Sequence, residues 1–329
     1  MRGWRAARLL LIVGGAVLLA VLVARNDPRA LLDTLATLSW RILIVLAFPF
    51  PLVNLFDTLG WRFAFRHDRV PLRTLYFARL AGEAVNVTTP TASLGGEAVK
   101  AWLVRRHVSV EAATSSVIVA KTTIAIAQGW LLVVGIACAW WVLPPDSAVL
   151  RGMEWLLLVE VVAVGLFVAA QVGGLFAGGG RLLKRFGMLA SDSAGLTRLD
   201  DSLSAFYRGQ PRRLSLSIVF HFLGWLTSAL ETWVILALLG IEVSLLTAVV
   251  IEAFSTAIRF ATFMVPGSLG ALEGGHVAIF VALGFTGTAG LSYSLVRRIR
   301  EATWVGIGFI ALVVLRSGDT AVAVPTADG

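Results

Sequence analysis

Long apolar stretches with very few charged residues recur along the chain, and they limit what it can fold into. A helix of about 20 apolar residues spans the hydrocarbon core of a bilayer. Six stretches approach or exceed that length: residues 9–24, 40–61, 112–143, 155–176, 214–239 and 292–315. With 57% hydrophobic and 15% charged residues, the 329-residue chain lacks the charged surface that a soluble protein of this size needs. We therefore expect an all-α polytopic membrane protein.

Basic residues gather between the apolar stretches, and they predict how the chain is oriented. The formal net charge is +8, and its clusters are not confined to one helix face as in nucleic-acid-binding proteins. Arginines precede the first stretch, fill the loop at 62–73 and close the last stretch at Arg316. Because basic loops stay in the cytoplasm, we expect a bacterial inner-membrane protein with both termini cytoplasmic and no nucleic-acid partner.

Two further segments are interrupted by proline and glycine and predict re-entrant hairpins. Residues 74–107 are too polar for a simple span, and residues 245–285 contain two shorter apolar runs. We therefore predict about six spans plus two hairpins, with eight spans as the alternative. The motif Phe48-Pro49-Phe50-Pro51 predicts a kink within the second span.

The domain organisation predicted from these segments is simple. Residues 1–316 form one transmembrane domain, and residues 317–329 form a polar tail that we expect to be disordered. Within the domain, residues 178–213 are basic and predict a cytoplasmic amphipathic segment. Its apolar residues recur at helical spacing, at Leu196, Leu199, Leu203 and Phe206.

An internal repeat links the two predicted hairpins. Residues 90–97 read PTASLGGE and residues 266–273 read PGSLGALE, so each motif runs from proline to glutamate in seven steps. The residue 31 positions after each proline is basic, at Lys121 and Arg297. The residue seven positions before each proline is charged, at Glu83 and Arg259.

Three predicted spans separate the two motifs, so the second motif enters the membrane from the opposite face. This arrangement is an inverted repeat, covering about 74–143 and 245–316. Inverted repeats place a substrate site near the middle of the membrane, where broken helices expose backbone groups to a cavity. A chance match of proline, glycine and glutamate at helix ends is the alternative.

Charged residues inside the apolar stretches support the same location for a site. Each costs about 2.5 to 3.5 kcal/mol at the centre of a lipid-facing helix, so we expect them to face the protein interior. For any one of them, a structural ion pair is the alternative to a functional role. The candidate substrate-binding residues are Glu83, Asn86, Pro90, Gly95, Gly96, Glu97, Lys121, Glu252, Arg259, Pro266, Gly267, Gly270, Glu273 and Arg297.

These residues suit a charged head group. Lys121 and Arg297 offer donors to a phosphate, and the glutamates offer acceptors to an ammonium group. One feature conflicts with the positive-inside rule, because Arg297, Arg298 and Arg300 fall on the predicted outer side. Either they are buried functional groups, or the chain has eight spans.

The residues required for most soluble-enzyme chemistry are missing. Cys138 is the single cysteine, and the four histidines lack the spacing of metal ligands. The chain has no Gly-x-Ser-x-Gly or phosphate-binding loop motif. We expect no cofactor, no metal and no catalytic residue.

Two motifs resemble one known family. They are Gly82-Glu83-x-x-Asn86-x-x-x-Pro90-x-x-x-x-Gly95-Gly96-Glu97-x-x-Lys100 and Pro266-Gly-x-x-Gly270-x-x-Glu273. They resemble the lysylphosphatidylglycerol synthase transmembrane, or flippase-like, family over about residues 5–315, with most similarity to stand-alone members linked to hopanoid biosynthesis. The resemblance implies translocation of a lipid between leaflets.

The sequence also departs from this family in two ways. Two-domain members carry a soluble aminoacyltransferase that makes the lipid, whereas here 13 residues follow Arg316. Members commonly have an arginine and an acidic residue one turn apart in the third span, whereas this chain reads Lys121-Thr-Thr-Ile-Ala125. The resemblance therefore implies a flippase that is not an enzyme, with the substrate class left open.

Three functions are compatible with these observations. The first is translocation of a lipid with a phosphate-containing or aminoacylated head group. The second is ion-coupled transport of a small solute, with the buried glutamates titrating. The third is a non-catalytic membrane partner of lipid-biosynthetic enzymes, which dock on the amphipathic segment.

Overall fold

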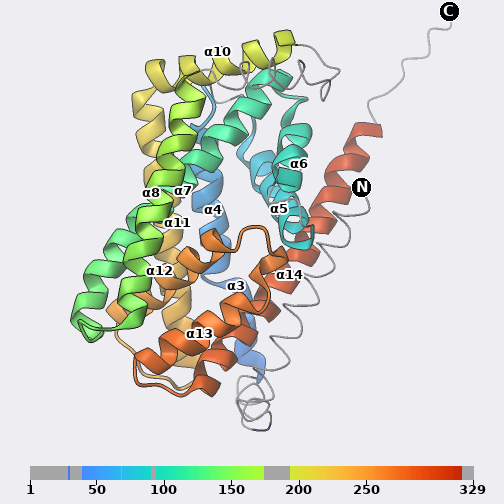
Figure 1. Cartoon of the computed structure of the whole chain (residues 1–329). Helices are drawn as coiled ribbons and strands as arrows, with labels where there is room; N and C mark the ends of the chain where they lie inside the picture. The colour runs from blue at the N-terminus through green and yellow to red at the C-terminus, as the bar shows by residue number, and fades with distance from the viewer. Residues whose placement is uncertain (1–28, 30–38, 68, 90–93, 174–192, 321–329) are drawn as a thin grey trace, which may run out of the picture.

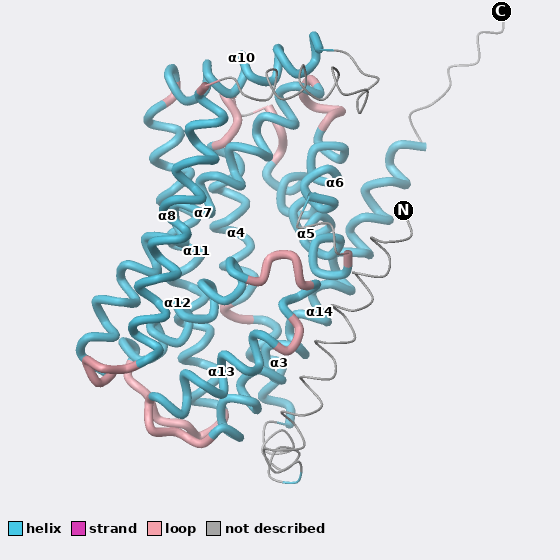
Figure 2. The backbone as a smooth tube through the Cα atoms, viewed as in Figure 1, coloured by secondary structure: helices cyan, strands magenta, loops and turns pink. Residues whose placement is uncertain are grey.

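The computed structural model describes residues 29, 39–67, 69–89, 94–173 and 193–320, and these residues form helices joined by short loops (Figures 1 and 2). No strand occurs among them, so the predicted all-helical class is confirmed. The predicted first span at 9–24, the motif residue Pro90 and the basic stretch at 178–192 lie outside the described residues.

The N-terminal half begins with a broken helix. After the 3₁₀ turn η1 (Ser39–Arg41), α3 (Ile42–Ala47) ends and α4 (Phe50–Phe63) starts beyond Pro49, so the break predicted at the proline pair is present. Helices α5 (Leu72–Thr88) and α6 (Leu94–Val104) then form the first hairpin. The long α7 (Val110–Val142) and α8 (Ala148–Val172) follow as an antiparallel pair.

The C-terminal half repeats this order. Helix α10 (Ser193–Gly209) precedes the long α11 (Pro211–Leu238). Helix α12 (Leu245–Ala261), the turn η2 (Pro266–Ser268) and α13 (Ala271–Ala282) form the second broken segment, and α14 (Gly287–Thr320) ends the described chain. Because α14 continues to Thr320, the tail expected to be disordered from Ser317 is helical over its first four residues.

The packing of the two halves is reciprocal. Helix α14 of the second half packs along α5 of the first, and α7 of the first half packs along α12 of the second. The hairpin partners α5 and α6 correspond to α12 and α13. In each half, the long helix after the hairpin therefore packs against the hairpin of the other half, as expected of related units.

Four helices in the described residues are long and apolar enough to cross a membrane: Ile42–Phe63 (α3 with α4), α7, α8 and α11. Three of them, α7, α8 and α11, lie between the two motifs in the chain, which matches the three spans predicted there. Helix α14 is long as well, but it carries four charged residues, Arg297, Arg298, Arg300 and Glu301, in two turns. The total number of spans stays a prediction.

Helix α10 lies across one end of the bundle, against α7 and α8 (Figure 1). Its Leu203 and Phe206 are fully buried in a core cluster with Trp61, Leu75 and Val117. The predicted amphipathic helix is therefore present between 193 and 209. Residues 211–213, which were assigned to the same segment, instead start α11, because Pro211 favours the first turn of a new helix.

Candidate functional site

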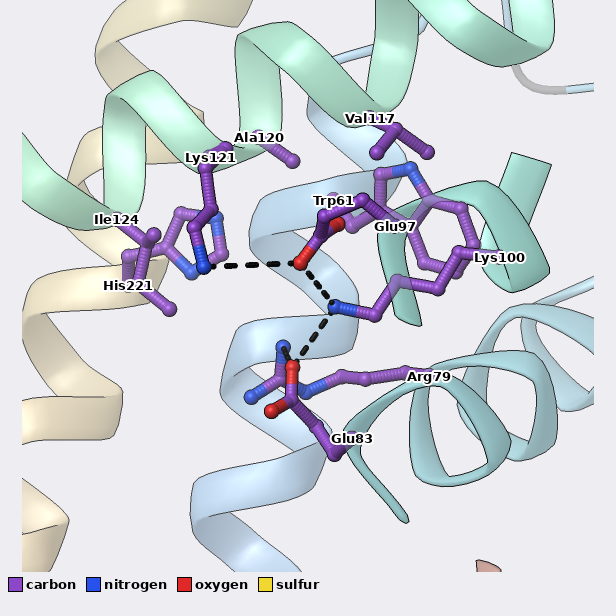
Figure 3. Close-up of a pocket in the computed structure, with 10 residues that line it drawn as sticks. All are labelled: Trp61, Arg79, Glu83, Glu97, Lys100, Val117, Ala120, Lys121, Ile124 and His221. Carbon is purple, nitrogen blue, oxygen red and sulfur yellow. Dashed lines mark hydrogen bonds and ion pairs between the residues drawn. The ribbon is translucent and has the colours of Figure 1, made fainter. Parts of the chain in front are cut away.

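The first cavity lies where α4, α5, α6, α7 and α11 meet (Figure 3). It is an open-sided space with about 340 Å³ not filled by protein atoms, a figure that includes open solvent. Its lining combines charged and apolar side chains: Trp61, Arg79, Glu83, Glu97, Lys100, Val117, Ala120, Lys121, Ile124 and His221. Three predicted site residues, Glu83, Glu97 and Lys121, therefore converge on one space.

A chain of ion pairs runs across this first cavity. The Lys100 Nζ atom lies 2.7 Å from Glu83 Oε1 and 3.0 Å from Glu97 Oε1. The Lys121 Nζ atom lies 3.7 Å from the same Glu97 oxygen. Figure 3 shows these contacts linking three helices, α5, α6 and α7. Lys121 has no acidic residue one turn away on its own helix, and its acidic partner is Glu97 on α6.

Three residues that the sequence did not single out complete the network. Arg79 forms an ion pair with Asp57 of α4 and lies 3.8 Å from Glu83. Asp57 Oδ1 is 3.0 Å from Nδ1 of His221 on α11, and both residues are buried. The one signal for Asp57 was its charge within an apolar stretch. Nothing in the local sequence linked it to Arg79 or His221, which lie 22 and 164 positions away.

The contact between helices α5 and α6 depends on glycine and asparagine. The Gly96 amide donates to Asn86 Oδ1 at 2.8 Å, and Asn86 Nδ2 donates to Glu97 Oε1 at 3.2 Å. A Cβ atom on Gly96 would collide with the Gly82 carbonyl oxygen and with Asn86. The close approach of the two helices requires glycine there, so Asn86 and Gly96 position Glu97. Gly95 lies beside them in the first turn of α6, partly exposed.

Exposure separates two of the charged groups from the others. The side chains of Lys121 and Glu83 are 47% and 39% exposed, whereas that of Lys100 is 7% exposed. The cation Lys121 and the anion Glu83 are thus accessible to a ligand, whereas Lys100, which pairs with Glu83 and Glu97, is buried.

The second cavity lies in the other half, between α12, α13 and α14, where about 210 Å³ is free of protein atoms, open solvent included. It is lined by Arg259, Leu272, Glu273, His276, Ser294, Arg297, Arg298 and Glu301. Four of these positions lie 176 residues after lining positions of the first cavity: Glu83 and Arg259, Glu97 and Glu273, Lys100 and His276, Lys121 and Arg297. The predicted repeat therefore extends to the residues that line each cavity.

Arg298 bridges three residues around the second cavity. Its Nε donates to Glu273 Oε1 at 2.6 Å, and its Nη1 donates to Glu301 Oε2 at 2.8 Å and to the Gly267 carbonyl at 2.7 Å. Glu273 Oε2 also accepts from the Gly270 amide at 2.7 Å. These contacts hold the loop that contains η2, which starts at Pro266.

Gly267 and Gly270 have φ values of 55° and 79°, a region that favours glycine. The Gly-x-x-Gly spacing of the second motif is therefore explained by backbone conformation. It shapes the loop, and the glycines themselves are not among the cavity-lining residues.

Arg297, a lining residue of the second cavity, is itself buried in a cluster of polar side chains. It forms a bidentate ion pair with Glu252, with 3.2 Å between Nη2 and Oε1, and its Nη1 donates to the Tyr293 hydroxyl at 2.7 Å. Thr232 donates to the same Glu252 carboxylate at 2.8 Å. Arg300 lies 2.9 Å from Glu231. The sequence offered two explanations for arginines on the predicted outer side: buried groups or an eight-span topology. The structure favours buried groups, because Arg297 and Arg300 are both buried in ion pairs.

Apart from Glu252, and from Pro90, which lies outside the described residues, the predicted site residues fall into three groups. Glu83, Glu97 and Lys121 line the first cavity, while Arg259, Glu273 and Arg297 line the second. Asn86 of α5 and Gly95 and Gly96 of α6 lie where these two helices meet, and Pro266, Gly267 and Gly270 belong to the loop that contains η2. Glu252 lines neither cavity and pairs with Arg297, and Arg259 lies 3.4 Å from Glu301.

A helical membrane protein with two related charged cavities is the class that this geometry defines. Residues 6–309 match the family described as the lysylphosphatidylglycerol synthase transmembrane region, and the chain belongs to that family. It is also similar to a UPF0104 membrane protein of Methanothermobacter thermautotrophicus, at 25% identity over 316 residues, which covers 88% of this chain and 90% of the relative. No solved structure matches this chain. The family is related to membrane lipids, as the sequence resemblance implied.

Proposed function

We propose that this protein translocates a lipid with a phosphate-containing or aminoacylated head group between the leaflets of the bacterial inner membrane. In this proposal both termini are cytoplasmic and the chain catalyses no covalent chemistry. The observation that carries the proposal is the first cavity, where the accessible ammonium of Lys121 and the partly exposed carboxylate of Glu83 belong to a network of paired charges.

The first step of the argument concerns the head group. The ammonium of Lys121 is 3.7 Å from its nearest carboxylate oxygen, longer than the hydrogen bonds that hold Lys100. It is therefore the cation of the network that a phosphate can recruit with the least rearrangement. Glu83 is exposed on the opposite side and can accept from an ammonium group.

The second step concerns the part of the lipid next to the head group. Trp61, Val117 and Ile124 line the same cavity and offer apolar contact. An open-sided cavity between helices allows acyl chains to stay in the bilayer while the head group enters the protein. This combination of polar and apolar walls suits an amphiphile better than a small polar solute.

The third step concerns passage between leaflets. In the repeat, the second cavity is the counterpart of the first, and Arg298 bridges the residues around it. Related cavities of opposite orientation provide one head-group site for each leaflet, connected by movement of one half against the other.

A third function, a membrane partner of lipid-biosynthetic enzymes, would use α10 as the docking surface. Its Leu203 and Phe206 are already buried against the bundle, so these two residues are not available to a partner. This favours transport over a scaffold role, and such enzymes enter the proposal only as sources of the lipid.

The test is movement of labelled lipids between leaflets of proteoliposomes. Anionic, zwitterionic and aminoacylated phospholipids are compared for the wild type, Lys121→Met and Glu97→Gln. A charge-assisted hydrogen bond contributes about 1.5 to 3 kcal/mol, so we expect each variant to be about 10- to 100-fold slower. Arg151→Met, at an exposed position on α8, is the matched control and should match the wild type.

The outcomes separate the three functions. If no lipid class moves faster with wild-type protein than in empty liposomes, lipid translocation is wrong. If lipids move but Lys121→Met and Glu97→Gln are as fast as the control, the first cavity is not the site. Uptake of a small polar solute without lipid movement would favour the solute carrier.

A further inference from the structure

Helix α8 carries a carboxyl group at its midpoint, with twelve helical residues on each side of Glu160. The outward face of this helix is apolar and exposed, including Trp155, Leu158, Val161 and Val162. These side chains face lipid in a membrane. Glu160 therefore lies near the middle of the bilayer, on the outermost long helix of the bundle.

The Glu160 side chain points inward, away from lipid. It is 1% exposed and belongs to the buried stripe of α8 that also contains Met153 and Gln171. Gly129 of α7 faces it, since a Cβ atom on this glycine would lie 4.0 Å from the Glu160 carboxyl carbon. The missing side chain at Gly129 makes room for the carboxyl group between the two helices.

Neither oxygen of Glu160 has a hydrogen-bond partner among the described residues. The buried stripe shows that the fold can supply partners, because Gln171 is bonded to Thr122 at 3.0 Å and accepts from Tyr207 at 2.7 Å. The buried carboxylates Asp57, Glu231, Glu252 and Glu273 each pair with an arginine. Glu160 differs from all of them.

The helices packed against α8 are α7, α10, α12 and α13. Their charged or titratable side chains in the described residues are Glu111, Lys121 and Cys138 on α7, Arg198, Asp200, Asp201, Tyr207 and Arg208 on α10, Glu252 and Arg259 on α12, and Glu273 and His276 on α13. None of these side chains forms a hydrogen bond or ion pair with Glu160, so no cation in the described residues balances a negative charge there.

An unpaired carboxylate in this environment is strongly disfavoured, and binding a proton removes the charge. We propose that Glu160 is a proton-binding site at the middle of the membrane and that its protonation is coupled to the position of α7. Coupling follows from the helix itself. Gly129 lies eight residues after Lys121, which is about 12 Å along α7. A movement of Lys121 with its ligand therefore moves the surface that covers Glu160.

The inference goes beyond the proposed function, and its first test does not depend on lipid movement. Dicyclohexylcarbodiimide is an apolar reagent that adds a protonated carboxyl group across one of its N=C bonds. The carboxyl oxygen bonds to carbon, the proton goes to nitrogen, and nothing leaves. The acyl group then shifts to nitrogen, so the labelled peptide gains the full mass of the reagent.

The full-length protein in proteoliposomes is treated between about pH 5 and 9, and the modified peptide is located by mass spectrometry. We expect label on Glu160 at low pH, falling about tenfold for each pH unit once the group has titrated. The isosteric variant Glu160→Gln should lose this label. Glu154→Gln, at an exposed position on the same helix, should keep it. Absence of label on Glu160 at every pH, or label that does not change with pH, would overturn the proposal.

The second test addresses coupling. Lipid movement by the wild type should change when a pH gradient is imposed, and Glu160→Gln should lose that response while still moving lipid. An equal response in the two proteins would overturn the coupling. If no protein moves lipid but Glu160 is labelled as expected, the proposed function fails and the proton site stands.

Discussion

The buried pair of Arg297 and Glu252 gives the sharpest test of how the second half is built. Both residues were candidates for substrate binding, yet the structure places them in contact with each other, with 9% and 2% of their side chains exposed. We predict that Arg297→Met lowers the free energy of unfolding and that the loss comes from the carboxylate left behind.

The magnitude follows from the contacts. Without Arg297, Glu252 keeps only the hydroxyl of Thr232 as a hydrogen-bond donor in the described part of the chain, while it stays buried. Removing one partner of a buried ion pair destabilises a protein by about 3 to 5 kcal/mol. Adding Glu252→Gln removes the unpaired charge, so the double variant should recover all but about 1 to 2 kcal/mol.

The assay is unfolding in mixed micelles as the fraction of denaturing detergent is increased, with the four proteins of the double-mutant cycle compared. The exposed variant Arg151→Met is the control and should change the free energy of unfolding by less than about 0.5 kcal/mol. A loss below about 1 kcal/mol for Arg297→Met would refute the reasoning. A double variant whose free energy of unfolding is no higher than that of Arg297→Met would also refute the reasoning.

Two further predictions concern helix contacts. Gly96→Ala should force α6 away from the Gly82 carbonyl and slow lipid movement in the proteoliposome assay. Gly165→Ala on α8, where an added Cβ atom meets no atom within 4 Å, should not slow it. Equal rates for these two variants would contradict the close contact between α5 and α6. Phe206→Ala should lower the free energy of unfolding in mixed micelles by about 3 to 5 kcal/mol, because the side chain is 1% exposed in the core under α10. Exposed Asp201→Ala should change it by less than about 0.5 kcal/mol, and similar losses for both would mean that α10 is not packed as described.

The sequence alone determined the helical class and the segments that repeat. Hydrophobic length and arginine placement are local properties, because the bilayer acts on each stretch independently. The repeat was also visible locally, since its motifs contain glycines that the structure requires. Gly96 allows the close contact of α6 with α5, and Gly267 and Gly270 take the positive φ values of the η2 loop. Glu83, Glu97 and Lys121 could therefore be identified as candidates, and the structure places all three around one cavity.

Which charges meet was decided by tertiary structure. The repeat pointed to Arg297 as the counterpart of Lys121, yet its neighbour Arg298 is the residue that contacts Glu273, the counterpart of Glu97. One residue turns a helix by about 100°, so the rotation of α14 against α12 and α13 decides which arginine faces the cavity. The contacts of Asp57 with Arg79 and His221 join three helices, and the missing partner of Glu160 depends on how α7 and α8 pack. These depend on distances between helices, which no local pattern in the sequence encodes.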